Sequence, residues 1–593
     1  MQRKTLVSLA LVLVAAVVTA YLPALQAGFV WNDDTYLTEN PTLDTLDGLR
    51  LIWTEPRASE QYYPMVFTSF WVEKHLWSLR PFGYHLVNVL LHAGSALLLW
   101  RLLVRLSLPG AWLAAAAFAL HPVCAESVAW VTERKNTLSL FLSLLAMLAY
   151  LVALGKRERE KTRKFPKKGK RERPAPAPAA RTGALSFAAL FLFLLALFAK
   201  TTACAVPAVL LVLVWWKKGR IEAADVRPLV PFFALGAALA FHTAWLERTM
   251  VRAAGQEWSL SLPGRVVLAG QTAVFYAARL AIPAKLAFVY ERWRVDPRLL
   301  SQWIPAASAL LALAAGFFLA RRLRRGPLAG LLLFFGVLFP AMGFFNVYAM
   351  RYSWVADHFA YQAAAVFAAC TVCGGFSWGA HAGAATRRAL TALAVTVLAI
   401  LGTLTFRHSR SFHDPETLWR ETLERSPDCF MCQTNYGNWL MENGREDEAV
   451  AHFEKSLALK PDNVPTLLNL ARIEESHGRF DEAAARLRAA LAVDPTDTTA
   501  LINLGTVSTK AGRLDEAISS YQEALRLGSS GDYLAHNGLG VALMRRGSAA
   551  EAVEQFREAL RLRPDYEFAR ANLERALSVS NGLGAVAPRP PAM

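Results

Sequence analysis

Long apolar runs occupy the first 406 residues of the chain, and a different pattern follows them. A membrane-spanning helix needs about 17–25 predominantly apolar residues, and eleven runs reach or approach this length. After Phe406, charged and apolar residues recur at helical spacing, which predicts soluble helices. The pattern therefore predicts an all-α protein, with a polytopic membrane bundle of about eleven spans followed by a soluble helical region. The runs are Thr5 to Leu25 and residues 83–106, 110–131, 137–155, 184–200, 201–216, 229–246, 303–320, 328–345, 356–376 and 389–406.

Basic clusters at the ends of these runs predict the orientation of the spans, because cytoplasmic loops carry an excess of Lys and Arg. The run 184–216 is basic at both ends, so we expect a hairpin that turns near Lys200 and Pro207. The run 264–283 is predicted to be re-entrant or interfacial, since a full span there would place later Arg clusters on the wrong side. The N-terminus is then inside and everything after Phe406 outside. The clusters are Arg3/Lys4, Arg101/Arg105, Lys156–Arg181, Lys217/Lys218/Arg220, Arg321/Arg322/Arg324/Arg325 and Arg387/Arg388.

The first run has a second interpretation as a signal peptide, because Leu25-Gln26-Ala27 ends in a small residue. A retained span is favoured, since many spans follow.

Composition supports the membrane class: 54% of the 593 residues are hydrophobic and 19% are charged. The net charge of +17 does not predict nucleic-acid binding, because much of it lies in Lys156–Arg181, which holds twelve Lys or Arg and three Glu. We interpret residues 155–183 as a disordered basic cytoplasmic loop beside anionic lipid headgroups. Cys429 and Cys432 form a CxxC, where a disulfide is possible if that side is oxidising.

A 34-residue repeat begins near Pro427, which recurs as Pro461 and Pro495. Turn residues Gly444, Gly478, Gly512 and Gly547 separate two helices in each unit. Gly437, Ala471, Gly505 and Gly540 mark close helix approach, and Phe453, Leu487, Tyr521 and Phe556 fill the space between helices. This register resembles the tetratricopeptide repeat. The predicted organisation is a membrane domain over 1–406, a linker and half-repeat over 407–426, four repeats over 427–563, a capping helix over 564–578 and a disordered tail over 579–593.

Ionisable residues at the outer ends of the spans predict a site, because each costs about 2.5–3.5 kcal/mol to place in a membrane. The predicted topology gathers them at one membrane face. The candidates are Asp33 and Asp34 after the first run; His85, His121, Glu126, Arg134 and Lys135 around the second to fourth; Lys200 at the hairpin turn; and Arg351, Asp357 and His358 at the beginning of the tenth.

Each candidate also has a structural interpretation. Asp33 and Asp34 could cap a loop helix, and Arg134 and Lys135 could be snorkelling anchors. His85 and His121 lie on apolar faces, where a histidine is more often a hydrogen-bonded core residue.

Four segments resemble conserved blocks of the transmembrane and tetratricopeptide repeat-containing O-mannosyltransferase-like proteins, which are GT-C class glycosyltransferases, and in particular their bacterial relatives. The segments are Phe29–Pro41, Pro81–His92, Phe118–Asn136 and Met350–Tyr361. The resemblance implies a membrane hexosyltransferase that uses a polyprenyl-phosphate sugar, with mannose as the implied hexose. It also implies that an acid of the first external loop, Asp33 or Asp34, is the catalytic centre. One departure is Lys200-Thr201, where the family commonly carries a Lys-Glu pair.

The expected mechanism is a single inverting displacement. A phosphate leaving group needs cations to stabilise its developing charge, and Arg351, Lys135, Lys200 and His358 are the candidates. Asp33 or Asp34 would accept the proton of the attacking hydroxyl. Because Arg and Lys can neutralise the phosphate, no metal or other cofactor is required, although the Asp33 and Asp34 carboxylates are a pair that could hold a metal ion.

The expected partners are the lipid donor, the membrane and a protein or peptide acceptor presented by the repeats. The expected location is a bacterial inner membrane, with the repeats on the periplasmic side. The alternatives are a non-catalytic membrane scaffold for an envelope or secretion assembly and a transporter. A transporter fits less well, because the polar groups gather at one face instead of at the midplane.

Overall fold

The computed structural model describes residues 3–59, 61–164, 179–249, 259–322, 324–379, 383–529 and 531–580. Over these ranges the chain is helical and has no strand. It divides into two compact units, Met1–Pro427 and Asp428–Met593, which are described separately below. The all-α prediction is confirmed.

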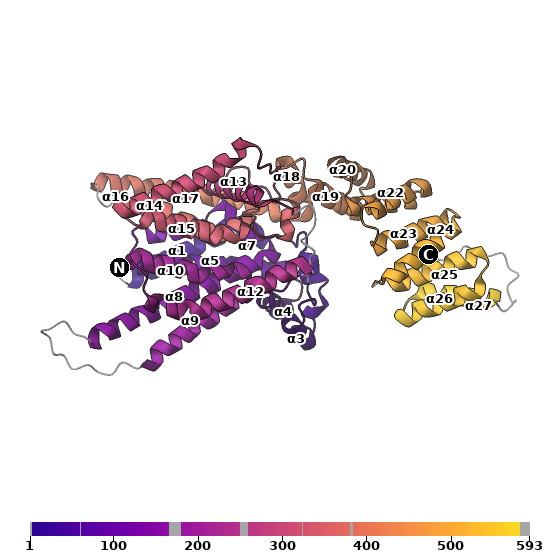
Figure 1. Cartoon of the computed structure of the whole chain (residues 1–593), viewed down its shortest axis with the longest axis horizontal. Helices are drawn as coiled ribbons and strands as arrows, with labels where there is room; N and C mark the ends of the chain where they lie inside the picture. Colours follow the sequence, from indigo (N-terminus) through magenta and orange to yellow (C-terminus); the bar gives the residue numbers. More distant parts are fainter. Residues whose placement is uncertain are drawn as a thin grey trace. The chain divides into compact units, whose positions relative to one another are not determined.

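The first unit contains helices α1 to α18 (Figure 1). The first nine are α1 (Arg3–Ala20), α2 (Leu22–Leu25), α3 (Leu46–Thr54), α4 (Pro64–Trp77), α5 (Pro81–Arg105), α6 (Ala111–Ala119), α7 (Ala125–Ala129), α8 (Arg134–Lys164) and α9 (Ala179–Ala199). The remaining nine are α10 (Val206–Lys218), α11 (Ala223–Val226), α12 (Val230–Thr249), α13 (Leu262–Ala281), α14 (Ile304–Arg322), α15 (Gly326–Leu338), α16 (Tyr361–Gly379), α17 (Ala384–Ser409) and α18 (Pro415–Arg425).

Eight helical segments of the described chain are long and apolar enough to cross a membrane, judged by length and composition. A ninth is possible if Ala111–Ala119 and Pro122–Ala129, which meet at a bend of 51°, form one broken span. The chain is thus a multi-pass membrane protein. The two other predicted runs form the shorter apolar helices Gly183–Ala199 and Gly326–Ala341, so the finding is eight or nine candidate spans rather than eleven.

The chain has a helix break near Lys200 and Pro207, where the pattern predicts one. Helix α9 ends at Ala199, and a 3-10 turn over Thr201–Ala205 separates it from α10, which has a proline in its first turn. Proline is favoured there because it lacks the N–H that a helix start leaves unpaired. Helix α13 covers the run predicted to be re-entrant. Residues 165–178 of the predicted basic loop lie outside the described residues.

The segment predicted as a linker and half-repeat is helical and part of the first unit. Helix α18 begins at Pro415, and its N-cap Asp414 accepts a hydrogen bond from the backbone of Thr417. Trp419 of α18 contacts Trp31 and Phe288, with ring centroids 6.0 and 5.7 Å apart.

The second unit consists of paired helices and a final helix. The four turn glycines all have left-handed backbones, with φ from +74° to +96°. A Cβ at Gly437 would lie 2.6 Å from the Phe453 ring, so that glycine permits the close helix approach predicted from the repeat. Residues 581–593 of the predicted tail lie outside the described residues. The helices are α19 (Phe430–Glu442), α20 (Glu446–Leu459), α21 (Val464–Ser476), α22 (Phe480–Val493), α23 (Thr498–Lys510), α24 (Leu514–Leu527), α25 (Asp532–Arg546), α26 (Ala549–Leu562) and α27 (Glu567–Ser580).

The start of the second unit carries a disulfide between Cys429 and Cys432. Cys429 is the N-cap residue of α19, and its sulfur accepts a hydrogen bond from the Cys432 backbone. A buried polar group lies nearby: the Asn463 amide donates to Thr434, Ser456 and Thr466 at 2.7–2.9 Å. These bonds join the first two helix pairs.

Candidate functional site

The loop after α2 carries the two aspartates and is held in an unusual conformation. Trp31 has φ +49°, a left-handed value that few residues other than glycine adopt. Its indole stacks on Trp130, with ring centroids 5.2 Å apart, and meets Phe288 edge-on. Aromatic packing therefore fixes the backbone immediately before Asp33.

Asp33 is fully buried, and both of its carboxylate oxygens are engaged. One oxygen accepts from the Thr132 backbone at 2.8 Å and from the Thr132 hydroxyl at 2.6 Å. The other accepts from the Val30 backbone at 3.0 Å. Burial raises the pKa of Asp33 from 3.8 to about 6, and the hydrogen bonds from Thr132 and Val30 act in the opposite direction. Asp33 thus clamps the first loop to the turn that precedes α8.

Asp34 has a different environment from its neighbour. It is exposed and begins a π-helical turn over Asp34–Thr38. One carboxylate oxygen accepts from the Thr35 backbone at 2.7 Å. The two adjacent carboxylates are therefore not equivalent: one is enclosed and one faces solvent.

Glu133 is the centre of a buried charged cluster beside this loop. The Lys135 amine lies 2.9 Å from one carboxylate oxygen, and the Lys200 amine lies 3.6 Å from the other. The Asn136 amide donates to Glu133 at 2.6 Å and accepts from Lys200 at 2.8 Å. His358 Nε2 lies 3.9 Å from Glu133. Three basic groups, from α8, the α9–α10 turn and the 3-10 turn Asp357–Ala360 before α16, thus converge on one acid.

His358 is fixed by a second acid. Glu126 accepts from the His358 backbone at 2.8 Å and lies 2.7 Å from its Nδ1. Because Nδ1 faces Glu126, Nε2 is directed toward Glu133. The neighbouring Asp357 is buried and accepts from the Tyr290 hydroxyl at 2.8 Å.

Lys200 and Lys135 are both almost enclosed by protein. Burial lowers the pKa of Lys200 to about 8, while the Glu133 carboxylate acts against that change. The Lys135 amine also faces the rings of Tyr36, Tyr63 and Trp130, at 5.7–5.8 Å from their centroids. Cation–π attraction supplements the ion pair there.

Arg134 faces away from this cluster and belongs to the scaffold. Its side chain is fully buried and forms a two-point ion pair with Glu73, one contact being 3.1 Å. It also donates to Asn88, to the Ser69 hydroxyl at 3.2 Å and to the Tyr84 carbonyl at 2.8 Å. A snorkelling anchor would extend to water, so that interpretation of Arg134 is wrong.

The other predicted site residues are placed as follows. His85 Nε2 lies 3.1 Å from the Gly28 carbonyl, and His121 Nε2 lies 3.0 Å from the Leu280 carbonyl. Both are buried, and His121 has a backbone partner for each ring nitrogen, as core histidines do, whereas Nδ1 of His85 has no hydrogen-bond partner among the described residues. Arg351 ends a 3-10 turn, with its guanidinium 6.0 Å from the Tyr352 ring. Over the described ranges Arg351 is not among the ion pairs of Glu133.

The sequence interpretation did not assign roles to Glu133, Asn136 or Glu73. The signal for the first two was the run Glu133-Arg134-Lys135-Asn136 at the start of an apolar span, where four polar residues need partners. Nothing local pointed to Glu73, because its partner is 61 positions away.

The resulting site has basic groups that could bind a phosphate and a carboxylate that could accept a proton. In the part of the chain that the structure describes, no group of three or more His, Cys, Asp or Glu is arranged to hold a metal ion.

Family models match the second unit. Tetratricopeptide repeat models cover residues 428–496, 468–532 and 510–567. The repeat prediction is therefore confirmed. Such repeats suggest protein binding.

Curated relatives are protein O-mannosyl-transferases, and their similarity lies over the repeats. Tmtc3 of Drosophila melanogaster is 33% identical over 172 residues, which are 24% of this chain and 18% of that protein. F38B6.6 of Caenorhabditis elegans is 28% identical over 155 residues, 24% of this chain and 22% of that protein. Human TMTC3 is 29% identical over 154 residues, 24% of this chain and 17% of that protein. The matched segment thus spans about a fifth of the relatives' own length.

Solved structures also match over about a quarter of the chain. The crystal structure of MamA is 24% identical, with a TM-score of 0.24, and covers 26% of this chain and 83% of its own. YrrB, a TPR protein with an unusual peptide-binding site, is 20% identical, with a TM-score of 0.25. The match covers 28% of this chain and 85% of the YrrB chain. Taken with its apolar helices, the chain is a multi-pass membrane protein with distant, partial homology to the tetratricopeptide repeat-containing O-mannosyltransferases.

Proposed function

We propose that the chain is a GT-C-like membrane glycosyltransferase that moves a hexose from a polyprenyl-phosphate donor to hydroxyl groups of exported proteins. The observation that carries the proposal is the cluster in which Lys135, Lys200 and His358 surround Glu133, beside the loop that bears Asp33 and Asp34. Partial homology to O-mannosyltransferases supports the same reaction class and makes mannose the first sugar to test.

The donor phosphate would bind the basic side of the cluster. As the sugar leaves, the phosphodiester becomes a phosphomonoester and gains negative charge, which fixed cations stabilise. Lys135 and Lys200 are pre-positioned by Glu133 and Asn136, so little rearrangement is needed to present them. His358 would offer Nε2, because Glu126 holds Nδ1. Arg351 would contribute only after a movement of its turn.

The acceptor hydroxyl would be activated by Asp34. Its oxygen attacks the anomeric carbon, the bond from that carbon to the phosphate oxygen breaks, and the hydroxyl proton passes to the Asp34 carboxylate. A single displacement inverts the anomeric centre. Asp33 is the positioning residue in this scheme: its oxygens are occupied by Thr132 and Val30, so it orients the loop rather than touching substrate.

The repeats would bind the acceptor protein. Tetratricopeptide arrays form extended binding surfaces, and the second unit folds around its own core. We propose that this unit raises the local concentration of acceptor segments at the membrane unit.

The test is hexose transfer from a polyprenyl-phosphate sugar by membranes that contain equal amounts of each variant. Asp34→Asn should lower kcat by about 10²–10⁴, the usual contribution of a general base. Lys135→Met and Lys200→Met should lower kcat as well as raise the KM for the donor, because these cations stabilise the charge that develops on the phosphate. Asp47→Asn is the matched control, because Asp47 is exposed on α3 and pairs only with Arg50 among the described residues. Wild-type kcat in the Asp34→Asn variant would contradict the assigned base.

A second candidate is a non-catalytic scaffold. It is favoured by Thr201, which stands where the resembling family commonly has an acid and here pairs with Thr243 at 2.7 Å. Affinity capture with the full chain separates the two. A scaffold would retain stable folded partners in both wild type and Asp34→Asn, and it would show no transfer in any membrane preparation. A transferase would instead retain unfolded segments rich in Ser and Thr.

A further inference from the structure

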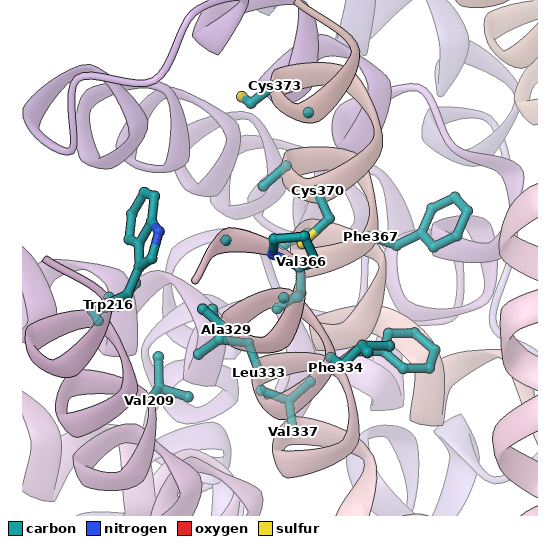
Figure 2. Close-up of a pocket in the computed structure, with 18 of the residues that line it drawn as sticks. Val209, Trp216, Ala329, Leu333, Phe334, Val337, Val366, Phe367, Cys370 and Cys373 are labelled. Carbon is teal, nitrogen blue, oxygen red and sulfur yellow. The ribbon is translucent and has the colours of Figure 1, made fainter. Parts of the chain in front are cut away.

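A large apolar cavity lies within the first unit, separate from the charged cluster. Its volume is about 1470 Å³, and helices α5, α8, α10, α14, α15 and α16 contribute most of its wall. Figure 2 shows Val209 and Trp216 of α10 across the space from Ala329 of α15 and Val366 of α16. Most of the lining is aliphatic or aromatic. An apolar cavity of this size in a membrane protein is suited to hydrocarbon chains.

The cavity extends along most of α16. Gln362 and Trp378 both line it, and they are sixteen positions apart on α16. At 1.5 Å per residue this corresponds to about 24 Å along the helix. One leaflet contributes roughly half of the about 30 Å hydrocarbon thickness of a bilayer. The cavity can therefore hold acyl chains that enter from one end without reaching the other.

The two ends of the cavity differ in charge. Arg322, Arg324 and Arg325, from the connection between α14 and α15, line one end. Trp216 and Trp378 line the same end, and tryptophan is typical of the boundary between headgroups and hydrocarbon. The other end is lined by Ala205 and Gln362 and has no charged side chain among its described lining residues.

The arginine end of the cavity lies next to the turn that follows α10. A Cβ at Gly219 would lie 2.2 Å from Nη1 of Arg325, so this guanidinium lies directly over the glycine backbone after α10. Gly219 has φ +83° and caps α10. Arg325 is thereby held beside the cavity mouth, close to Trp216.

We propose that the cavity is a binding site for an anionic glycerophospholipid of the membrane, with its acyl chains in the apolar space and its phosphate on Arg322, Arg324 and Arg325. Basic pockets between membrane helices bind anionic headgroups, and arginine binds phosphate through paired N–H groups. The bound lipid fills the space between α10, α15 and α16 and holds these helices together. This inference is independent of glycosyl transfer and requires only that the chain spans a membrane.

The glycosyl donor is a less suitable occupant of the arginine end. In the proposed function the donor phosphate lies at Lys135 and Lys200. The end of the cavity opposite the arginines is close to that cluster in the chain, because Gln362, which lines it, follows soon after His358. A donor with its phosphate at Lys135 and Lys200 would extend only its hydrocarbon tail toward the arginines. An uncharged tail has no electrostatic attraction to these cations. A glycerophospholipid uses both features of the cavity.

The experiment uses the full chain in nanodiscs of phosphatidylcholine alone or with phosphatidylglycerol, and it measures retained lipid by native mass spectrometry. The wild type should retain phosphatidylglycerol over phosphatidylcholine by about tenfold or more, as about 1.4 kcal/mol of selective contact would give. Arg322→Gln/Arg325→Gln should lose that preference. Arg387→Gln/Arg388→Gln is the matched control, because that basic pair begins α17 and does not line the cavity.

A second variant addresses the apolar part alone. Ala369→Trp places a large side chain in the cavity while keeping all three arginines, and it should also reduce retention by about tenfold. If the arginine variants do not fold, the retention of phosphatidylglycerol by Ala369→Trp tests the proposal by itself. Equal retention by wild type and Ala369→Trp would overturn the proposal, as would equal losses in the Arg322/Arg325 and Arg387/Arg388 variants. Displacement of phosphatidylglycerol by polyprenyl phosphate would overturn it in favour of the donor lipid.

Discussion

The buried ion pair between Arg134 and Glu73 offers the sharpest test of the scaffold beside the site. Arg134 is among the largest fully buried side chains of the protein. Replacing Glu73 by Met would leave a guanidinium without its carboxylate in a dry environment. Breaking such a pair costs about 3–5 kcal/mol. We expect a loss of this size in the unfolding free energy of Glu73→Met, and of Arg134→Met as well.

The double variant Glu73→Met/Arg134→Met should be more stable than either single variant. Replacing a whole buried pair by apolar residues is often neutral or stabilising. Recovery relative to Glu73→Met will be partial here, because Asn88 and the Tyr84 carbonyl lose their Arg134 donor in the double variant, as they do in Arg134→Met. An unpaired buried acceptor costs about 1–3 kcal/mol, so we expect the double variant to regain about 2 kcal/mol relative to Arg134→Met or Glu73→Met.

Equilibrium unfolding of the full chain in mixed detergent micelles measures these differences. The exposed pair Arg557 and Glu554 is the matched control, because both side chains are more than half exposed and such pairs contribute about 0–1 kcal/mol. A single-variant loss no larger than that of Arg557→Met would refute the scaffold role of Arg134. Additive losses in the double variant would refute the coupling.

Three further predictions concern the loop and the repeats. The raised pKa of Asp33 means that its folded form keeps a proton between about pH 4 and 6, so stability should fall as the pH rises through this window. The change from 3.8 to about 6 corresponds to about 3 kcal/mol, and unfolding measured from pH 4 to 8 should show less pH dependence in Asp33→Asn. Gly505→Ala should destabilise the repeats by about 1–3 kcal/mol, because its Cβ would lie 2.7 Å from the Tyr521 ring. Gly512→Ala should cost about 1 kcal/mol by backbone strain alone, since φ is +79° and the space is open. Hydrogen exchange in α23 and α24 measures both glycine variants, and equal protection in Gly505→Ala and wild type would contradict the packing argument.

The repeats could be predicted from the sequence because their determinants are local. Gly444 and its counterparts mark left-handed turns at intervals of 34 residues, with one additional residue before the last, and Gly437 faces a ring only sixteen residues away. Both features follow from spacing within one repeat. The membrane helices could also be located, because hydrophobic length is a property of a single segment.

The site could be predicted only as a set of residues. Asp33 and Asp34 look identical in the sequence, yet one is enclosed by Thr132 and the other faces solvent. That difference depends on a contact across 99 positions, which no local pattern encodes. Arg134 and Glu133 likewise received their roles from distant partners.

Arg134 and Lys135 are consecutive in the chain but have different partners. Arg134 forms the scaffold ion pair with Glu73, and Lys135 belongs to the Glu133 cluster. One residue advances an α-helix by about 100°, so the two roles depend on the phase of α8. Inserting or deleting a single residue between Pro122 and Glu133 would shift Arg134 relative to Glu73, whereas Lys135 would keep its place beside Glu133. We therefore expect natural relatives to tolerate altered side chains in this turn more readily than altered spacing, which makes the length of the segment itself an inherited constraint.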